Sequence, residues 1–354
     1  MFHLPILNIK CYTNIETSVK RGRCKLAVKA YTTVIPDGMK SIIFAQIGVQ
    51  AKSYEESAAL TARIAESFKL PHGPIHVDHG QFTDNADYKN QLFMAYWNEL
   101  EAYEAWLRHS EIQQWWNGGG LAANLGVYHE VAKIPTTHFE TIHSIHNHNS
   151  GATHFLQLQE TKEHAYWGSM RKRIPASSAE RFDAQVDRIE HQKKKTRGKH
   201  LKIIPPDNIC LIRSAQDWTR CSDEEKETYF SLVEPALQKF YRHLNANQEE
   251  NGCLNPKFVQ ELDKNGSPAE KTCVVSFFLS LKHLEDWTHH HPTHIALFGA
   301  FAEMLRRHDL SVQLSLWHEV SVLQSGQLDL EYLNCHPDTG FLPYFEAKEV
   351  AHIL

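Results

Sequence analysis

Ser-Ile-Ile-Phe-Ala-Gln-Ile-Gly-Val-Gln at residues 41–50 is followed, at residues 53–68, by Ser-Tyr-Glu-Glu-Ser-Ala-Ala-Leu-Thr-Ala-Arg-Ile-Ala-Glu-Ser-Phe. The first stretch is rich in apolar and β-branched residues, which favours a strand. The second opens with a serine and has a glutamate three residues later, the signature of a capping box. Leu60, Ile64 and Phe68 then recur at helical spacing. The two stretches predict a strand followed by a helix.

Further elements follow in the order of a ferredoxin-like unit. They are strands at residues 74–82 and 91–97, a helix at 99–116 and a strand at 126–134. Strand, helix, strand, strand, helix, strand is the ferredoxin-like arrangement. A similar order returns later in the chain. Its elements are a strand at 208–214, a capped helix at 222–244, strands at 257–262 and 272–281, a helix beginning near Pro292 and a strand at 312–323.

Specific residues also recur between the two halves, at spacings of 181 and 189 residues. The matched pairs are Leu100 with Leu281, Glu104 with Glu285, Trp106 with Trp287, and His129-Glu130-Val131 with His318-Glu319-Val320. Two matching triplets indicate duplication, and the alternative is chance similarity between amphipathic elements. We therefore predict an α+β fold of duplicated ferredoxin-like units, of the dimeric α+β barrel type, with antiparallel sheets and helices on one face.

The predicted boundaries follow from this repeat. They define an N-terminal extension at 1–38, a first unit at 39–135, an inter-repeat segment at 136–200 and a second unit at 201–354, which includes a C-terminal tail. A long segment without regular pattern in a compact fold is usually functional or partly disordered. We interpret its basic run, residues 193–197, as a solvated and mobile loop.

Composition excludes several classes of function. The formal charge of -5 gives no reason to expect nucleic acid or an anionic membrane as a partner. No stretch approaches the roughly 20 apolar residues of a membrane helix. The start of the chain lacks the pattern of a secretory signal, so the expected compartment is the cytoplasm. The seven scattered cysteines favour reduced thiols over a disulfide framework.

The strongest local signal is His-His-His-Pro-Thr-His at residues 289–294. Proline is favoured at the first position of a helix, so a helix is expected to begin at Pro292, with His294 in its first turn. Phe298, Phe301 and Leu305 follow on the same helical face, which is apolar. An imidazole on such a face is either a core histidine with a hydrogen-bond partner or a ligand to something buried.

Two groups of histidines could in principle bind a metal ion, but the sequence favours other interpretations of both. His290 and His294 have the spacing of a zinc pair, with Asp286 as a possible third ligand, but Pro292 between them is expected to break the helix that the pair needs. His143, His146, His148 and His154 lie near Glu140 among loop-forming residues. A flexible, polar histidine-rich loop is the preferred interpretation of this second group.

Three further positions could carry chemistry. His318 shares its strand face with apolar residues, so it is either a core histidine or a group that lines a cavity together with His294. Ser214 ends an apolar strand, where a serine is usually a turn or cap residue. The cluster Arg171-Lys172-Arg173 is, by its residues alone, a solvated basic turn.

Five blocks of sequence together resemble the aldoxime dehydratase family of the phenylacetaldoxime type. The resemblance extends over most of the chain from about residue 40, while the first 38 or so residues look divergent. The blocks are Tyr-Trp-Gly-Ser-Met-Arg-Lys-Arg-Ile-Pro (166–175), Asn-Ile-Cys-Leu-Ile-Arg-Ser-Ala-Gln-Asp-Trp (208–218), His-Pro-Thr-His (291–294), Trp-His-Glu-Val-Ser-Val (317–322) and Glu-Tyr-Leu-Asn-Cys-His-Pro-Asp-Thr-Gly (331–340).

The resemblance implies a non-covalent haem b, ferrous in the active state, in a duplicated ferredoxin-like fold that is usually a homodimer. His294 resembles the family's proximal ligand and His318 its distal catalytic histidine. Ser214 matches the distal serine, and Arg173, rather than Arg171, matches the distal arginine. Glu140 matches a glutamate near the active site. The inter-repeat segment is thereby expected to contribute to the site.

The implied reaction is the dehydration of an aldoxime, R–CH=N–OH, to a nitrile. The oxime nitrogen would bind ferrous haem, which can feed electron density into the N–O bond. Hydroxide is a poor leaving group, so His318 would protonate the oxime oxygen and later accept the proton from the oxime carbon. Ser214 and Arg173 would hydrogen-bond that oxygen, and an apolar pocket would take the alkyl or aryl group.

Two alternatives stay open from the sequence. One is a haem enzyme that uses peroxide, such as a peroxidase or a chlorite-dismutase-like protein. The other is a haem carrier or sensor, which would use the axial histidine but has no need of Ser214, Arg173 and His318. Nitrile formation from an aldoxime under reducing, oxygen-free conditions separates all three.

Overall fold

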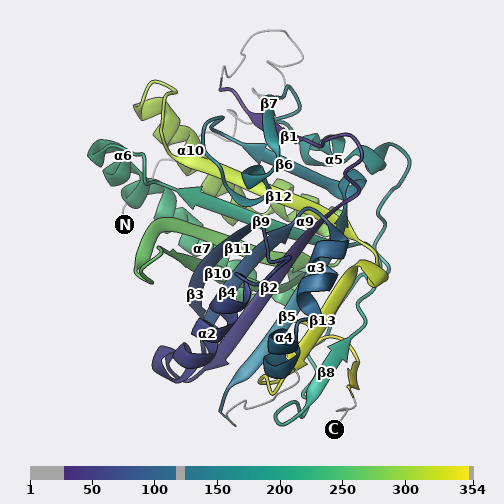
Figure 1. The fold of residues 1–354 in the computed structure, drawn as a ribbon. Helices are drawn as coiled ribbons and strands as arrows, with labels where there is room; N and C mark the ends of the chain where they lie inside the picture. Colours follow the sequence, from purple (N-terminus) through teal and green to yellow (C-terminus); the bar gives the residue numbers. More distant parts are fainter. Residues whose placement is uncertain (1–27, 117–123, 351–354) are drawn as a thin grey trace, which may run out of the picture.

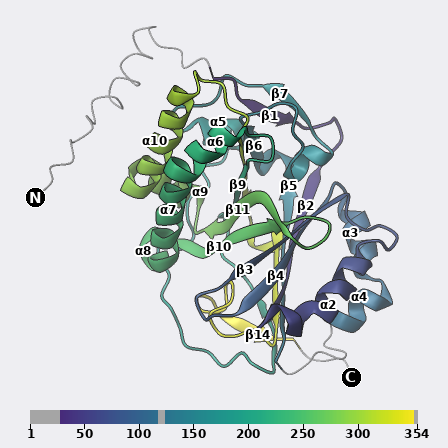
Figure 2. The ribbon, with the colours of Figure 1, turned by 90° about the vertical axis from the view of Figure 1, so that its left-hand side faces the viewer.

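The computed structural model describes residues 28–116 and 124–350. It is a mixed α/β fold built on one sheet of 14 strands in the order β14-β8-β13-β5-β2-β4-β3-β10-β11-β9-β12-β6-β1-β7, and every strand pair is antiparallel. Helices cover the sheet at two opposite sides of the molecule (Figures 1 and 2). Among the described residues, no helix combines the length and apolar character that crossing a bilayer requires.

The first half contains the predicted elements with small changes at their ends. They are β2 (Ser41–Ala51), α2 (Tyr54–Ser67), β3 (His76–Thr83), β4 (Lys89–Trp97), α3 (Leu100–Leu107), α4 (Ser110–Trp116) and β5 (Gly126–Pro135). Their order in the sheet is β5-β2-β4-β3. The helix predicted at 99–116 is in fact two helices. The chain turns at Arg108 and His109, where the His109 ring lies 3.1 Å from the Pro71 carbonyl oxygen.

The second half has the same strand order, β12-β9-β11-β10, but it runs in the opposite direction along the sheet. Its elements are β9 (Ile209–Asp217), α6 (Asp223–Thr228), a π-helical turn (Tyr229–Val233), α7 (Glu234–Ala246), α8 (Gln248–Asn251), β10 (Cys253–Leu262), β11 (Pro268–Phe278), α9 (Leu281–His290), α10 (Pro292–Arg307) and β12 (Ser315–Leu323). The single helix predicted at 222–244 is therefore interrupted. Pro235 follows the π turn, and proline both lacks an N–H and crowds the preceding turn, which explains the widening.

The inter-repeat segment is more structured than expected. It contains three short 3-10 turns, β6 (Phe139–His143), β7 (Gln157–Glu160), α5 (Ser169–Arg173) and β8 (His200–Ile203). Strands β6 and β7 join β1 (Tyr31–Val34) beyond β12, whereas β8 joins β13 (Leu328–Leu333) and β14 (Ala347–Glu349) beyond β5 (Figure 1).

The basic run at 193–197 is also anchored rather than solvated throughout. The Thr196 hydroxyl is buried and donates to the Cys335 carbonyl at 2.8 Å, and Arg197 donates to the Asn334 carbonyl at 2.6 Å. These bonds tie the segment to the chain that follows β13.

Alternate residues of each strand face two different environments. One face of the sheet, here called the inner face, packs around a core shared by both halves, which includes Phe44 and Met94 from the first half and Leu211 and Phe277 from the second. The other, outer face is covered by α2–α4 in the first half and by α7, α9 and α10 in the second (Figure 2). Because the sheet is curved, the two groups of helices lie at opposite sides of the molecule but on the same, outer face of the sheet, as predicted.

Candidate active site on the outer face of β9 and β12

His318 and Ser214 lie opposite each other on neighbouring strands. The antiparallel register of β9 and β12 pairs their Cα atoms directly. Side chains in such a pair point to the same face and have Cβ atoms about 4.5–5.5 Å apart. Both residues are partly exposed. The structure therefore brings together the two predicted residues on one accessible part of the outer face.

Glu140 reaches the same place from β6, which pairs with the other edge of β12. Its side chain is fully buried, and Oε1 lies 2.9 Å from Nε2 of His318. Burial alone would raise the pKa of this carboxyl group, but the nearby Arg173 and His318 reverse the effect and hold its pKa below the ordinary value. Glu140 is therefore ionised at neutral pH.

Arg173, at the end of α5, completes a three-residue cluster. Its Nε donates to Oε2 of Glu140 at 2.6 Å, and one terminal nitrogen donates to the Glu163 carbonyl at 2.5 Å. The other terminal nitrogen lies 3.3 Å from Nε2 of His318. The arginine side chain is 5% exposed, so the reading of this cluster as a solvated basic turn is wrong for Arg173.

Arg171 has a different role. It forms an ion pair with Glu285 of α9, at 2.7 Å. The structure therefore places Arg173, and not Arg171, in contact with Glu140 and His318. The Arg171 pair fastens α5 to the helix that precedes α10.

Nε2 of His318 has a partner in either protonation state. A protonated Nε2 donates to the carboxylate of Glu140, whereas an unprotonated Nε2 accepts from the guanidinium of Arg173. A histidine whose two states are both satisfied can lose and regain a proton without leaving a buried group unpaired. This arrangement suits a general acid and base.

His294 lies in the first turn of α10, which begins at Pro292 as predicted. The zinc pair is not supported, because α9 ends at His290 and the two histidines lie on different helices. Burial lowers the pKa of His294 to about 4, and His318 is close enough to contribute to the lowering. Its Nδ1 atom is buried and has no hydrogen-bond partner in the described part of the chain.

These properties fit the haem that the resemblance implies. An iron ligand must be a neutral imidazole with a free lone pair, and His294 is neutral at neutral pH. The carbonyl of Thr288 lies near the ring and opposes the lowering of its pKa, which is the kind of acceptor that orients a ligating histidine. The apolar face beyond His294 is also suitable, since Phe298 is 45% exposed at its start and Leu305 is buried at its end.

The histidine-rich group lies in three kinds of backbone. His143 is buried in β6, and burial lowers its pKa to about 3. His154 ends a 3-10 turn, whereas His146 and His148 lie in irregular backbone, and the His148 ring is 2.6 Å from a carboxylate oxygen of Asp217. The prediction of a flexible polar loop is therefore wrong for His143. The described residues hold no group of three histidine, cysteine or carboxylate side chains placed to bind one metal ion.

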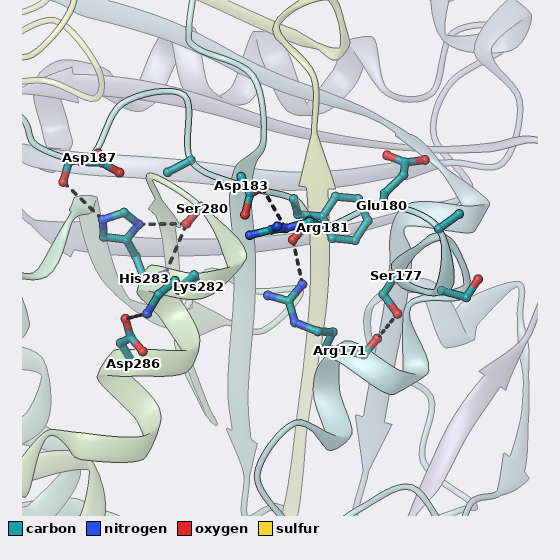
Figure 3. Close-up of a pocket in the computed structure, with 14 residues that line it drawn as sticks. Arg171, Ser177, Glu180, Arg181, Asp183, Asp187, Ser280, Lys282, His283 and Asp286 are labelled. Atoms are coloured by element: carbon teal, nitrogen blue, oxygen red, sulfur yellow. Dashed lines mark hydrogen bonds and ion pairs between the residues drawn. The ribbon is translucent and has the colours of Figure 1, made fainter.

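One surface cavity lies away from this cluster. It has a volume of about 630 Å³ and opens between residues 177–187 and the start of α9 (Figure 3). Arg171, Lys282 and Asp286 are among its lining residues, and Lys282 forms an ion pair with Asp286. None of the five predicted site residues lines this cavity, so it plays no part in the site described above.

Sequence reasoning gave no role to two charged residues that adjoin the site. Arg213 precedes Ser214 and Glu319 follows His318, so both point to the inner face. Both are buried. A charged residue inside an apolar strand pattern was the available signal, because such residues are rarely buried without partners.

Comparison with known proteins places the chain in a family. Residues 45–341 match the model of the haem-containing dehydratases. The chain is 45% identical to a phenylacetaldoxime dehydratase of Bacillus sp. (strain OxB-1), over 91% of this chain and 93% of that protein. It is 32% identical to an aliphatic aldoxime dehydratase of Pseudomonas chlororaphis, over 86% of this chain and 87% of that protein.

Solved structures agree with the sequence matches. A crystal structure of an aldoxime dehydratase in complex with butyraldoxime aligns with a TM-score of 0.84 at 29% identity, covering 90% of both chains. A second crystal structure of an aldoxime dehydratase gives a TM-score of 0.83, also at 29% identity, over 92% of this chain and 94% of the other. By sequence and by fold, the chain belongs to the haem-containing dehydratase family.

Proposed function

We propose that this protein dehydrates aldoximes to nitriles and water, with haem b held non-covalently by His294. The observation that carries the proposal is the cluster of Glu140, Arg173 and His318, with Ser214 opposite His318 and His294 near enough to His318 for the two rings to interact electrostatically. The names of the relatives support the same reaction. When bound, the haem supplies a ferrous iron that can bind the oxime nitrogen and weaken the N–O bond.

His318 carries the proton that the leaving oxygen needs. In this proposal the imidazolium gives a proton to the oxime hydroxyl, which leaves as water, and the neutral imidazole then takes the proton from the oxime carbon. Glu140 stabilises the charged ring before the first transfer, and Arg173 satisfies Nε2 when that nitrogen is unprotonated. One residue can thus serve as acid and then as base.

Ser214 and Arg173 orient the substrate in this proposal. The serine hydroxyl lies on the same face as His318, and the guanidinium is fixed by Glu140 and by the Glu163 carbonyl. Donors that are held in place before the reaction stabilise developing charge without reorganising. They would hold the oxime oxygen toward the His318 ring.

The function is tested with the purified protein, hemin, dithionite and an aldoxime under nitrogen gas. Phenylacetaldoxime and butyraldoxime should both be supplied, because the relatives include enzymes of the aryl and the aliphatic type. We expect nitrile to form from at least one of them. Oxidation of a dye by peroxide without nitrile would instead indicate the peroxide-using enzyme, and haem binding without either activity would indicate a carrier or sensor.

Replacing Glu140 with glutamine should lower kcat by about 10²-fold, since a misplacement of about 1 Å in a catalytic group costs that much. The substitution removes the negative charge of the carboxylate that both Arg173 and His318 contact, and both side chains would shift. Steady-state nitrile formation by haem-loaded protein measures the effect. Glu285→Gln is the matched control, because it removes the carboxylate that pairs with Arg171 outside the site. Equal kcat values for the two variants would argue against the assigned role.

Haem affinity should be insensitive to pH down to about 4. The pKa of His294 falls from 6.5 to about 4 through burial, so the ring stays neutral and able to bind iron above that value. As pH falls through 4, the ring takes up a proton and the ligand is lost. Titration of the apoprotein with hemin at pH 8 to 4, followed by the Soret band, measures the affinity. A decline that already starts near pH 6.5 would mean that His294 is solvated like an ordinary histidine.

We further propose that the two halves are duplicated ferredoxin-like units, that the enzyme is a homodimer and that it works in the cytoplasm. The repeated strand order, β5-β2-β4-β3 and β12-β9-β11-β10, supports the first point. The five cysteines in the described residues are free and buried, which suits a reducing compartment. Sedimentation or light scattering of the haem-loaded protein tests the dimer.

A further inference from the structure

A buried charged network lies directly behind the catalytic pair. Arg213 and Glu319 are paired across β9 and β12, one step from the pairing of Ser214 with His318. Because successive strand residues face opposite ways, these two point to the inner face. Arg213 is 1% exposed and Glu319 is 6% exposed.

Arg213 connects strand β9 to the first half of the molecule. Its two terminal nitrogens contact three groups from three different strands. These are Oδ2 of Asp78 on β3 at 2.8 Å, the Tyr96 hydroxyl on β4 at 2.9 Å, and Oε1 of Glu261 on β10 at 2.8 Å.

Glu319 connects strand β12 to the same place. The Tyr96 hydroxyl, which accepts from Arg213, donates in turn to Oε2 of Glu319 at 2.8 Å. Oε1 of Glu319 accepts from the backbone N–H of Ala152 at 2.6 Å. Both catalytic strands are therefore held by way of one tyrosine of the first half.

The chain at Gly151 is shaped to approach Glu319. Gly151 has a φ of +51°, and a Cβ there would lie 2.3 Å from Oε1 of Glu319. Only glycine gives both the backbone conformation and the space. The hydrogen bond from Ala152 to Glu319 thus depends on a glycine one residue earlier.

We infer that Arg213 and Glu319 are positioning residues, which hold β9 and β12 so that Ser214 and His318 keep their mutual placement; the inference rests on the proposed function of that pair. Backbone hydrogen bonds fix the register of two strands but allow them to bend and slide together. Side chains that tie both strands to the first half from the inner face restrict this bending and sliding. Apolar residues of similar volume often stabilise a core equally well, so the charged network supplies placement as well as stability.

The other half of the molecule offers a matched control. Glu130 corresponds to Glu319, and its carboxylate pairs with Lys257 at 2.7 Å, with side chains 0% and 1% exposed. Glu130 also accepts from the Tyr332 hydroxyl at 2.9 Å. On its outer face, however, the neighbouring His129 is buried against Trp116, at 4.9 Å between ring centroids. This network is equally buried and charged, but among residues 28–116 and 124–350 no accessible site lies in front of it.

The test compares Arg213→Met, Glu319→Ala and Glu319→Gln with Lys257→Met, each as haem-loaded protein. Nitrile formation gives kcat and KM, and the infrared C–O stretch of the ferrous carbon monoxide complex reports how polar groups lie around the bound ligand. We expect Arg213→Met and Glu319→Ala to lose at least tenfold in kcat with KM changed less than threefold, and to broaden or shift the C–O band. Lys257→Met should leave kcat and the band as in the unaltered protein.

Glutamine at position 319 should restore most of the activity lost in the alanine variant. Its oxygen can accept from Ala152 and its amide can donate to the Tyr96 oxygen, so the link between β12 and β4 survives. If Arg213→Met does not fold, the two Glu319 variants decide the matter. A kcat for Glu319→Ala equal to that of Glu319→Gln and Lys257→Met would overturn the inference.

The two proposals fail in different ways. If the unaltered protein binds haem but forms no nitrile, the proposed reaction is wrong, and the C–O band still shows whether Arg213 and Glu319 place the outer-face groups. An unchanged band in Arg213→Met and Glu319→Ala would then overturn the positioning role. If nitrile forms and both variants are fully active, only the positioning role is wrong.

Discussion

Replacing His318 with alanine lowers kcat for nitrile formation by about 10²- to 10⁴-fold, the usual contribution of general acid and base catalysis, while haem stays bound. Without the ring, no group of the cluster can both give and accept the proton, because Glu140 is held ionised and Arg173 does not deprotonate. The haem is retained because His294 lies on a separate helix.

The measurement is single-turnover nitrile formation by the ferrous variant, with the Soret band recorded in the same sample. His143→Ala is a suitable control, since His143 lies two residues after Thr141, the partner of Glu319 in β6, and faces inward beside Trp317. A His318→Ala variant with near-normal kcat would remove the acid–base assignment. Loss of the Soret band in that variant would instead make His318 a haem-binding residue.

Replacing His294 with alanine should abolish stable haem binding and, with it, activity. His294 combines a lowered pKa and an unpartnered buried ring nitrogen with a place in the first turn of a helix whose Phe298 is exposed. Without this imidazole, the iron would lose the protein ligand that we propose for it. Imidazole added to the variant should restore part of the Soret band, because it can fill the space of the missing ring.

The control for this variant is His291→Ala. His291 caps α10 and stacks on Trp287, with ring centroids 3.9 Å apart. It therefore tests damage to the helix start without removal of the ligand. If His294→Ala retains one haem per chain with an unaltered spectrum, while His291→Ala loses it, the ligand is His291.

Local sequence patterns were sufficient where the structure depends on local interactions. The strand at 41–50 and the helix at 53–68 appear as β2 and α2, with Ser53 capping the helix as expected. The start of α10 at Pro292 was also predictable, because proline fixes the backbone that a first turn needs.

Helix α9 shows where the local pattern predicts the wrong element. Residues 279–281 are apolar enough to prolong a strand, and the sequence prediction extended β11 through them. The internal repeat predicts a helix here instead, since Leu281, Glu285 and Trp287 match residues of a helix in the first half. Ser280 caps α9 by accepting from the N–H of His283, and a serine at this position is a signal for the start of a helix.

The closing of the site could not be predicted from any local pattern. Glu140 and His318 are 178 residues apart in the chain and meet because β6 adds to the far edge of β12. Such a pairing depends on the whole sheet rather than on either segment. Family resemblance named the five residues, whereas the contacts of Arg173 with Glu140, and of Arg213 with the first half, came only from the fold.

The sequence predicts that one face of α10 is apolar, but it does not predict which residues of that face are buried. Leu305 is buried, whereas Phe298 is 45% exposed. Helical periodicity gives the direction of a side chain but not what covers it. The exposed end of this face lies toward His294, where the proposed haem would be bound.

The most direct test of the account is a titration of the purified apoprotein with hemin. We predict a Soret band that saturates at one haem per chain, because the second half presents His294 and the partly exposed His318, whereas His129, the first-half counterpart of His318, is buried. A colourless protein with no Soret band at saturating hemin would contradict the account.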